Sequence, residues 1–308
     1  MTSRKRWSAE EIPDLDGRVF VVTGANSGLG LATTRALARK GARVVLAVRD
    51  EAKGRKAVAE ITAVCPGARL EVRRLDLTDG ESIRAFAGRL ASDGVRPDVL
   101  VNNAGVMAPP RTLTDGGIEL QFAANHLGHF ALTGLLLDLL AGGDDPRVVT
   151  VTSANHRRAR IDFDDPTGAR SYSPMGRYNQ SKLANAVFGH ELHRRLTAAG
   201  SPVRSMLAHP GYTATGLQTS APVGSVRLLY GRVLLPLAQS PDQGALPQLY
   251  AATAPDAQGG ELYAPDGPGE LRGAPRRAVL APRATDPGTA ERLWRLSERL
   301  TDVRYGSA

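Results

Sequence analysis

Short apolar segments alternate with longer helical patterns over residues 17–207, and this alternation constrains the fold more than any other feature of the chain. Parallel strands must be joined by long crossover connections, which are usually helices, so the order predicts a doubly wound parallel sheet with helices on both faces. Most of the expected strands are nearly all apolar, as strands covered on both faces should be. They lie at residues 18–23, 43–48, 69–75, 98–102, 147–152, 203–208 and 259–264, about seven in all.

Helical periodicity falls between the strands, near residues 28–40, 50–63, 79–92, 116–141 and 175–199, and a last helix is expected over 287–300. A chain of 308 residues with 42% hydrophobic side chains can bury one large core. We therefore predict an N-terminal extension over residues 1–16 and a single α/β domain over 17–308. Ligands bind beyond the carboxyl ends of the strands in such sheets, so the loops at about 154–177 and 212–240 are expected to surround the substrate.

Composition excludes several classes of protein. The single cysteine, Cys65, has no partner for an intramolecular disulfide and cannot form a thiolate cluster. His126, His129 and His209 lack partners at metal-ligand spacing, so we predict no metal site. The basic residues 4–6 are not followed by the apolar segment of a secretory signal, and no apolar run is long enough to span a bilayer. We expect a cytoplasmic protein without a transmembrane anchor.

The net charge of +8 raises the question of nucleic-acid binding. The basic residues are scattered in pairs without interleaved aromatic residues, which make up only 5% of the chain. We interpret the excess as solvated surface charge and predict no nucleic-acid partner.

A glycine-rich segment, Thr23-Gly24-Ala25-Asn26-Ser27-Gly28-Leu29-Gly30, lies between the first expected strand and the first expected helix. Glycines permit a tight turn and a close approach of the backbone to a ligand, and the free N–H groups at a helix N-terminus attract phosphates. In this position the segment has the context of the dinucleotide-binding turn of a Rossmann fold rather than of a plain glycine-rich turn. We predict that Gly24, Asn26, Ser27, Gly28, Leu29 and Gly30 bind the cofactor.

The end of the second strand indicates which dinucleotide binds. An acidic side chain there would hydrogen-bond the ribose 2′-hydroxyl of NAD, but this chain has Val48 followed by Arg49. An arginine offers a fork of donors to a 2′-phosphate, so we favour NADP(H) over NAD(H). Two alternatives stay open: Asp50 facing the ribose, and Arg49 as a solvated surface residue.

Further motifs follow the later strands in order. They are Asp76-Leu77, Asn102-Asn103-Ala104-Gly105, Ser153 and Tyr178-Asn179-Gln180-Ser181-Lys182. Together with the glycine turn they closely resemble the short-chain dehydrogenase/reductase superfamily over residues 17–215. The segment 111–137, which includes Asn125-His126-Leu127-Gly128-His129-Phe130, is similar to the branch that contains retinol dehydrogenases and WW-domain oxidoreductases.

The resemblance implies roles for individual residues. It implies a catalytic tetrad of Asn125, Ser153, Tyr178 and Lys182, with Asn125 holding a water that links Lys182 to solvent. Tyr178 and Lys182 would also contact the cofactor, with Lys182 at the nicotinamide ribose. The remaining cofactor positions are Asp76 and Leu77 at the adenine, Asn103, Ala104 and Gly105 on the adenosine side, and Pro210, Gly211 and Thr213 at the nicotinamide end.

The chemistry of Tyr178 and Lys182 can be argued without the resemblance. Residues at i and i+4 share a helix face, and an ammonium together with a positive nicotinamide ring favours the phenolate of a nearby tyrosine. Tyr178 would then be a general acid/base, while Ser153 holds the substrate oxygen. Taken singly, the pair could be a surface tyrosine beside a lysine, Ser153 could begin a turn, and Asn125 could cap a helix.

We therefore predict an NADP(H)-dependent oxidoreductase that acts on a carbonyl or alcohol carbon of a small molecule. Residues 223–237 are rich in apolar side chains and form either a lid for a lipophilic substrate or part of the core, and weak contact with a membrane surface is compatible with them. A homo-oligomer is also compatible with the sequence. The alternative is a catalytically silent NADP(H)-binding scaffold, which substituted tetrad positions would signal; none is substituted.

Overall fold

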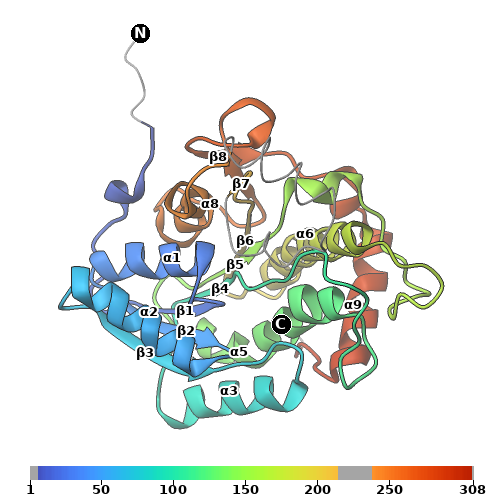
Figure 1. Ribbon diagram of the computed structural model, residues 1–308, viewed down its shortest axis with the longest axis horizontal. Coiled ribbons are helices and arrows are strands. Elements are labelled where there is room, and N and C mark those ends of the chain that lie inside the picture. The colour runs from blue at the N-terminus through green and yellow to red at the C-terminus, as the bar shows by residue number, and fades with distance from the viewer. Residues whose placement is uncertain (1–5, 214–237, 307–308) are drawn as a thin grey trace.

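A computed structural model describes residues 6–213 and 238–306 of the chain (Figure 1). The described residues form one sheet with the strand order β3-β2-β1-β4-β5-β6-β7-β8. All neighbours are parallel except β7 and β8. The chain builds outward from β1 to β3, returns to lie beside β1 as β4, and then continues to the other edge. The fold is thus the predicted doubly wound α/β sheet.

The strands lie close to where the sequence predicts them. They are β1 (Val19–Thr23), β2 (Arg43–Val48), β3 (Arg69–Arg74), β4 (Val99–Asn102), β5 (Arg147–Val151), β6 (Arg204–Ala208), β7 (Leu262–Pro265) and β8 (Pro275–Ala278). The count of about seven is corrected to eight. The additional strand, β8, lies in a segment rich in proline and arginine, and such a composition is tolerated in an antiparallel strand at the edge of a sheet.

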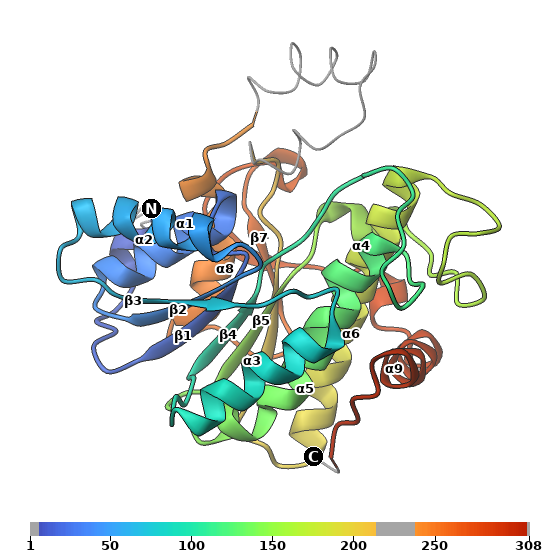
Figure 2. The same cartoon turned by 60° about the horizontal axis from the view of Figure 1, so that its bottom comes forward.

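Helices cover both faces of the sheet (Figure 2). The longer ones are α1 (Gly28–Arg39), α2 (Glu51–Val64), α3 (Gly80–Ser92), α5 (Gly128–Ala141), α6 (Pro174–Ala198), α8 (Pro241–Thr253) and α9 (Pro287–Thr301). Buried side chains of α1, α2 and α8 pack on one face, and those of α3, α5 and α6 pack on the other. Short helical turns lie at η1 (Ala9–Glu11), η3 (Ala154–Arg158), η7 (Pro268–Glu270) and η8 (Pro282–Ala284).

Two helical predictions need correction. The single helix expected over 116–141 is three pieces: α4 (Leu120–Phe122), a π-helix η2 (Ala123–Leu127) and α5. The helix α8 was not predicted, because it is buried on most sides and contains Pro247, which masks the one-sided apolar pattern of a surface helix. The question of lid or core at residues 223–237 lies outside the described residues.

The N-terminal segment contributes to the core. Ile12 and Leu15 are buried in the cluster that α1 and α8 form with the sheet, and Trp7 packs edge-on against Tyr250 of α8. At the opposite face, α9 packs across α5 and α6 through Trp294. Within the described residues, no helix is long and apolar enough to cross a membrane.

A buried arginine joins the sheet to α8. Arg147, at the start of β5, is 1% exposed, and its Nη1 donates to the backbone carbonyls of Ala251 and Ala254 at 3.1 and 3.0 Å. Its Nε donates to Asp145 at 3.1 Å. Burial lowers the pKa of Arg147, and the hydrogen bond with Asp145 opposes that shift.

We expect Arg147→Met to lower the free energy of unfolding by about 2–4 kcal/mol, because methionine fills similar space but leaves buried acceptors without their donor. The measurement is urea denaturation followed by circular dichroism. Arg194→Met is the control, because the Arg194 side chain is 62% exposed and its ion pair with Glu191 should contribute less than about 0.5 kcal/mol. Equal midpoints for the two variants would show that the Arg147 bonds contribute nothing.

Candidate active site

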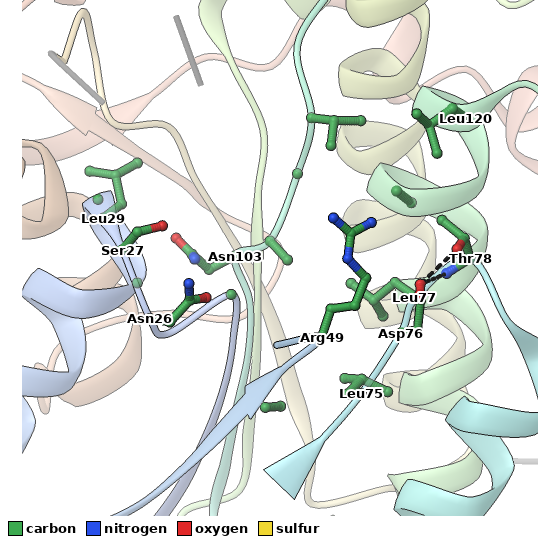
Figure 3. A pocket seen from close by; sticks show the side chains of 18 residues that line it. Asn26, Ser27, Leu29, Arg49, Leu75, Asp76, Leu77, Thr78, Asn103 and Leu120 are labelled. Atoms are coloured by element: carbon green, nitrogen blue, oxygen red, sulfur yellow. Dashed lines mark hydrogen bonds between the residues drawn. The ribbon is translucent and has the colours of Figure 1, made fainter. Parts of the chain in front are cut away.

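A cavity of about 370 Å³ opens where the strand order reverses, at the carboxyl ends of β1 and β4 (Figure 3). Open α/β sheets bind their ligands at such a switch point. Asn26, Ser27 and Leu29 lie on one side of the cavity, and Asp76, Leu77 and Thr78 lie on the other. The predicted cofactor residues lining it are Gly24, Asn26, Ser27, Gly28, Leu29, Gly30, Arg49, Asp76, Leu77, Asn103, Ala104 and Gly105.

The glycine turn requires its glycines. Gly24 and Gly28 have φ angles of 66° and 52°, in the left-handed region that other residues rarely adopt. A Cβ on Gly30 would lie 2.3 Å from the carbonyl oxygen of Gly24 and 2.7 Å from Nδ2 of Asn103. Any side chain at position 30 would therefore push the turn away from the loop that follows β4.

The N-terminus of α1 is open to a ligand. The N-cap side chains of α2, α3, α6, α8 and α9 all accept a backbone N–H, whereas Ser27, the N-cap of α1, makes no such bond within the described part of the chain. The N–H groups at this helix end and its positive dipole face the cavity wall that the glycines form. These residues fit the pyrophosphate of a nicotinamide dinucleotide.

The end of β2 presents an arginine to this cavity. Arg49 is exposed and extends from β2 toward the space between the glycine turn and Leu77 (Figure 3). Asp50 caps α2, because its side chain accepts the backbone N–H of Lys53 at 3.1 Å. That hydrogen bond lowers the pKa of Asp50.

A second cavity, of about 230 Å³, adjoins the first and shares Leu29, Asn103 and Gly105 with it. Its wall includes Ser153, Tyr178, Lys182, Pro210, Gly211 and Thr213. Three of the four predicted tetrad side chains therefore meet beside the predicted nicotinamide positions. The cavity also contains residues that the sequence analysis did not single out, among them Met107, Met175, Glu270 and Leu271.

Tyr178 and Ser153 form a hydrogen-bonded pair in the second cavity. Burial raises the pKa of Tyr178 to about 12, and its hydrogen bond with Ser153 acts in the opposite direction. In the chain alone, burial therefore outweighs the expected effect of the neighbouring ammonium, and the phenol is neutral. His156 supports Ser153, because its Nδ1 contacts the Ser153 carbonyl oxygen at 2.7 Å and its Nε2 accepts the N–H of Ala281 at 3.3 Å.

Lys182 lies on α6 with its ammonium directed at the end of β5. Nζ donates to the carbonyl oxygen of Val151 at 3.1 Å and lies 5.9 Å from the centroid of the Tyr178 ring. Burial lowers the pKa of Lys182 to about 8. The Thr152 hydroxyl donates to the Lys182 carbonyl oxygen at 2.7 Å, so helix and strand are joined at this point.

Asn125 lies behind the cavities and does not line either of them as the described residues define them. It belongs to the π-helix η2, where its Oδ1 accepts the N–H of Val106 at 2.7 Å. Its Nδ2 donates to the Val106 carbonyl at 3.0 Å and to the Ser181 hydroxyl at 2.9 Å. The side chain therefore joins the loop after β4 to the segment of α6 that carries Tyr178 and Lys182.

Glu270 connects three loops around the second cavity. Its Oε2 lies 2.8 Å from Nε2 of the buried His209 and 2.8 Å from Nη1 of Arg157, which follows Ser153 in η3. His209 in turn accepts the N–H of Gly211 at 3.1 Å. The hydrogen bond from His209 holds the pKa of Glu270 at about 2. No local signal marks Glu270, because its partners come from distant segments.

The loop after Ser153 has its own internal support. Arg177 and Asp165 are both buried, and Nη2 of Arg177 donates to Asp165 at 2.7 Å. Burial alone would raise the pKa of Asp165, but hydrogen bonds from the backbone of Ala169 and Arg170 hold it at about 2.

Across the described residues, no group of three or more His, Cys, Asp or Glu side chains is placed to hold a metal ion.

The fold and the site together define a doubly wound α/β protein with a cavity at the strand-order switch point and, in the adjoining cavity, a tyrosine and a lysine one helical turn apart. Residues 18–223 match the family described as short chain dehydrogenase. The chain belongs to the short-chain dehydrogenase/reductase family, whose members are oxidoreductases, and the predicted similarity to its retinol dehydrogenase-like branch is confirmed.

Similar proteins cover nearly the whole chain. Mouse retinol dehydrogenase 12 is 39% identical over 293 residues, which is 94% of this chain and 88% of that protein. Mouse polyprenol dehydrogenase is 41% identical over 303 residues, covering 96% of this chain and 88% of that protein. The crystal structure of an uncharacterised protein from Mycobacterium paratuberculosis is 44% identical, covers 98% of this chain and 100% of its own, and superposes with a TM-score of 0.81.

Lys182→Met should abolish turnover and raise the free energy of unfolding at pH 7 by about 1–3 kcal/mol, because burial of the ammonium is unfavourable. Below pH 8, Lys182 of the wild type is protonated in both the folded and the unfolded state. The destabilisation by the buried ammonium is then fully present. Between pH 8 and the ordinary pKa of 10.5, the folded wild type has lost a proton that the unfolded chain keeps, so its stability rises with pH.

The advantage of the Met variant should accordingly be largest below pH 8 and should shrink above it. The measurement is chemical denaturation of both proteins at several pH values. Lys56→Met on the exposed face of α2 is the control and should show no such pH dependence. A Lys182 variant less stable than the wild type at pH 7 would contradict the prediction.

Proposed function

We propose that the chain is an NADP(H)-dependent oxidoreductase that reduces a carbonyl carbon, or oxidises the corresponding alcohol, of a lipophilic small molecule. The observation that carries the proposal is the convergence of Ser153, Tyr178 and Lys182 on one cavity that shares a wall with the cavity of the glycine turn. A bound nicotinamide would supply or accept the hydride. The residues of this chain bind, orient and move the proton.

In the direction of reduction, the Tyr178 hydroxyl donates a proton to the substrate oxygen as negative charge develops there. Ser153 donates a hydrogen bond to the same oxygen and keeps it beside the phenol. The ammonium of Lys182 favours the phenolate that remains, and the positive charge of a bound nicotinamide acts in the same sense. Asn125 would link Lys182 to solvent through a water, as the family resemblance implies.

Three observations support a lipophilic substrate. The second cavity has apolar walls from Leu29, Met107, Val151, Met175 and Leu271. Glu270, a carboxylate that lines this cavity, is already paired with Arg157 and His209. The similar mouse proteins are named for retinol and polyprenol, which are both lipophilic alcohols.

The competing proposal is a silent NADP(H)-binding scaffold. Such a protein would need only the first cavity. Burial opposes the ionised forms of Tyr178 and Lys182, so the pair in the second cavity lowers stability and would not be expected in a protein without catalytic activity. The retained pair favours the enzyme.

Loops 154–177 and 212–240 are proposed to select the substrate, and the proposed location remains the cytoplasm.

Tyr178→Phe should lower kcat at least about 100-fold while leaving the Kd for NADPH unchanged, because only the proton donor is removed. NADPH consumption is followed by absorbance with a panel of lipophilic aldehydes and ketones, and Kd by NADPH fluorescence. Tyr250→Phe on α8 is the matched control and should retain full turnover. Full turnover by the Tyr178 variant would exclude it as the general acid.

Arg49→Gln should raise the Kd for NADPH about 10- to 100-fold and change the Kd for NADH less than about threefold, since a charge-assisted bond to the 2′-phosphate is lost. Arg39→Gln, at the far end of α1, removes the same charge and serves as the control. If the two variants weaken NADPH binding equally, Arg49 acts only through net charge and the preference for NADP(H) fails.

A further inference from the structure

His129 lies at the start of α5, one turn after Asn125, and neither cavity includes it. The residue is buried to 1% exposure, and both ring nitrogens have a partner at 2.9 Å. Nδ1 contacts the backbone carbonyl oxygen of Asn125, and Nε2 contacts the hydroxyl of Thr23. Thr23 ends β1 and immediately precedes the glycine turn. The imidazole therefore bridges the catalytic tetrad and the phosphate-binding turn.

The positions of the protons on this bridge follow from its partners. A carbonyl oxygen only accepts, so Nδ1 of His129 must carry a proton. Burial lowers the pKa of His129 to about 4; the hydrogen bond to Asn125 opposes that shift, and the charge of Lys182 adds to it. The ring is neutral at pH 7, so Nε2 has a lone pair and the Thr23 hydroxyl must donate to it.

The remaining contacts of Thr23 agree with this direction. Its Oγ1 lies 2.9 Å from the N–H groups of Asn103 and of Ala104, which can only donate to it. The carbonyl of Val101 is farther away, at 3.3 Å, and already accepts the N–H of Asn103 at 3.0 Å. The single hydroxyl proton is therefore directed at His129.

A continuous chain of donors thus runs through the buried site. It begins at the N–H groups of the loop after β4, passes through Thr23 and His129, and ends at the carbonyl of Asn125. Separately, the side-chain amide of Asn125 donates to the carbonyl oxygen of Val106 and to the hydroxyl of Ser181, next to Lys182. Because every bond from the loop after β4 to the Asn125 carbonyl has the same direction, each polarises the next, and reversal of one would disrupt its neighbours.

We propose that His129, protonated on Nδ1, is a positioning residue with two separable roles: through Nε2 it sets the cofactor-binding loops, and through Nδ1 it sets the tetrad. The inference rests on the proposed function for its catalytic half only. The binding half requires no turnover, because it concerns Thr23, Asn103 and Ala104, which hold the walls of the first cavity.

Two amide substitutions separate these roles. In His129→Asn the amide nitrogen occupies the place of Nδ1 and can still donate to Asn125, but nothing reaches Thr23. In His129→Gln the amide oxygen reaches the place of Nε2 and can still accept from Thr23, but the donor to Asn125 is lost. Both variants replace the ring with a primary amide, so each is the control for the other. Asparagine is smaller than glutamine by one methylene group, so loss of volume alone would make His129→Asn the more damaging variant in both Kd and kcat.

We expect His129→Asn to raise the Kd for NADPH about tenfold and to change kcat at saturating NADPH less than about threefold. His129→Gln should lower kcat about tenfold or more and change Kd less than about threefold. Kd is measured by NADPH fluorescence and kcat with nonanal as the carbonyl probe. Equal effects of the two variants on both quantities, or a larger effect of His129→Asn on both, would mean that loss of the ring matters and not its two hydrogen bonds, and would overturn the proposal.

A measurement on the wild-type chain tests the proton positions directly. In ¹⁵N-histidine spectra, with His129 assigned from the spectrum of either variant, we expect a neutral ring protonated on Nδ1 from pH 6 to 8. Protonation on Nε2, or a charged ring, would overturn the proposal even if both variants fold poorly. Failure of wild-type turnover with every carbonyl tested would reject the proposed function alone, because Kd and the spectra still decide the role of His129.

Discussion

The candidate active site depends on the attachment of α6 to the end of β5. Lys182 and Asn185 both donate to the carbonyl of Val151, and Thr152 donates to the carbonyl of Lys182. These bonds lie where β5 is about to release the chain into the loop that begins with Ser153. One short contact between a helix and a strand thereby brings the serine, the tyrosine and the lysine to one cavity.

This arrangement is electrostatically unfavourable in the isolated chain. Burial raises the pKa of Tyr178 and lowers that of Lys182, so each group is driven toward its neutral form. A phenol and an amine that resist ionisation respond strongly to a charge that arrives with a ligand, because the surroundings screen it weakly. Burying both groups lowers the stability of the isolated chain. A cost of this kind is typical of functional sites and supports the second cavity as the candidate active site.

Much of the fold and of the cofactor site could be predicted because the relevant signals are local. The strands from β1 to β7 were located within a few residues by their apolar runs, and the glycine turn was identified by its position between a strand and a helix. Each miss has a physical cause. β8 pairs at an edge where composition matters little, and α8 is buried on most sides and so lacks a one-sided apolar pattern. All five residues of η2 are buried, so no change in the apolar pattern marks where it interrupts the expected helix.

By itself, the sequence determined the class of fold, the glycine turn between the first strand and the first helix, and the spacing of Tyr178 and Lys182 on one helix face, because periodicity and backbone freedom are properties of neighbouring residues. Only the tertiary structure decided that Asn125 lies behind the loop after β4, that Glu270 joins three loops, and that His129 bridges the turn and the tetrad. Most of these contacts join segments far apart in the chain, and burial keeps the His129 ring neutral. Neither separation in space nor burial is encoded in any short stretch of residues.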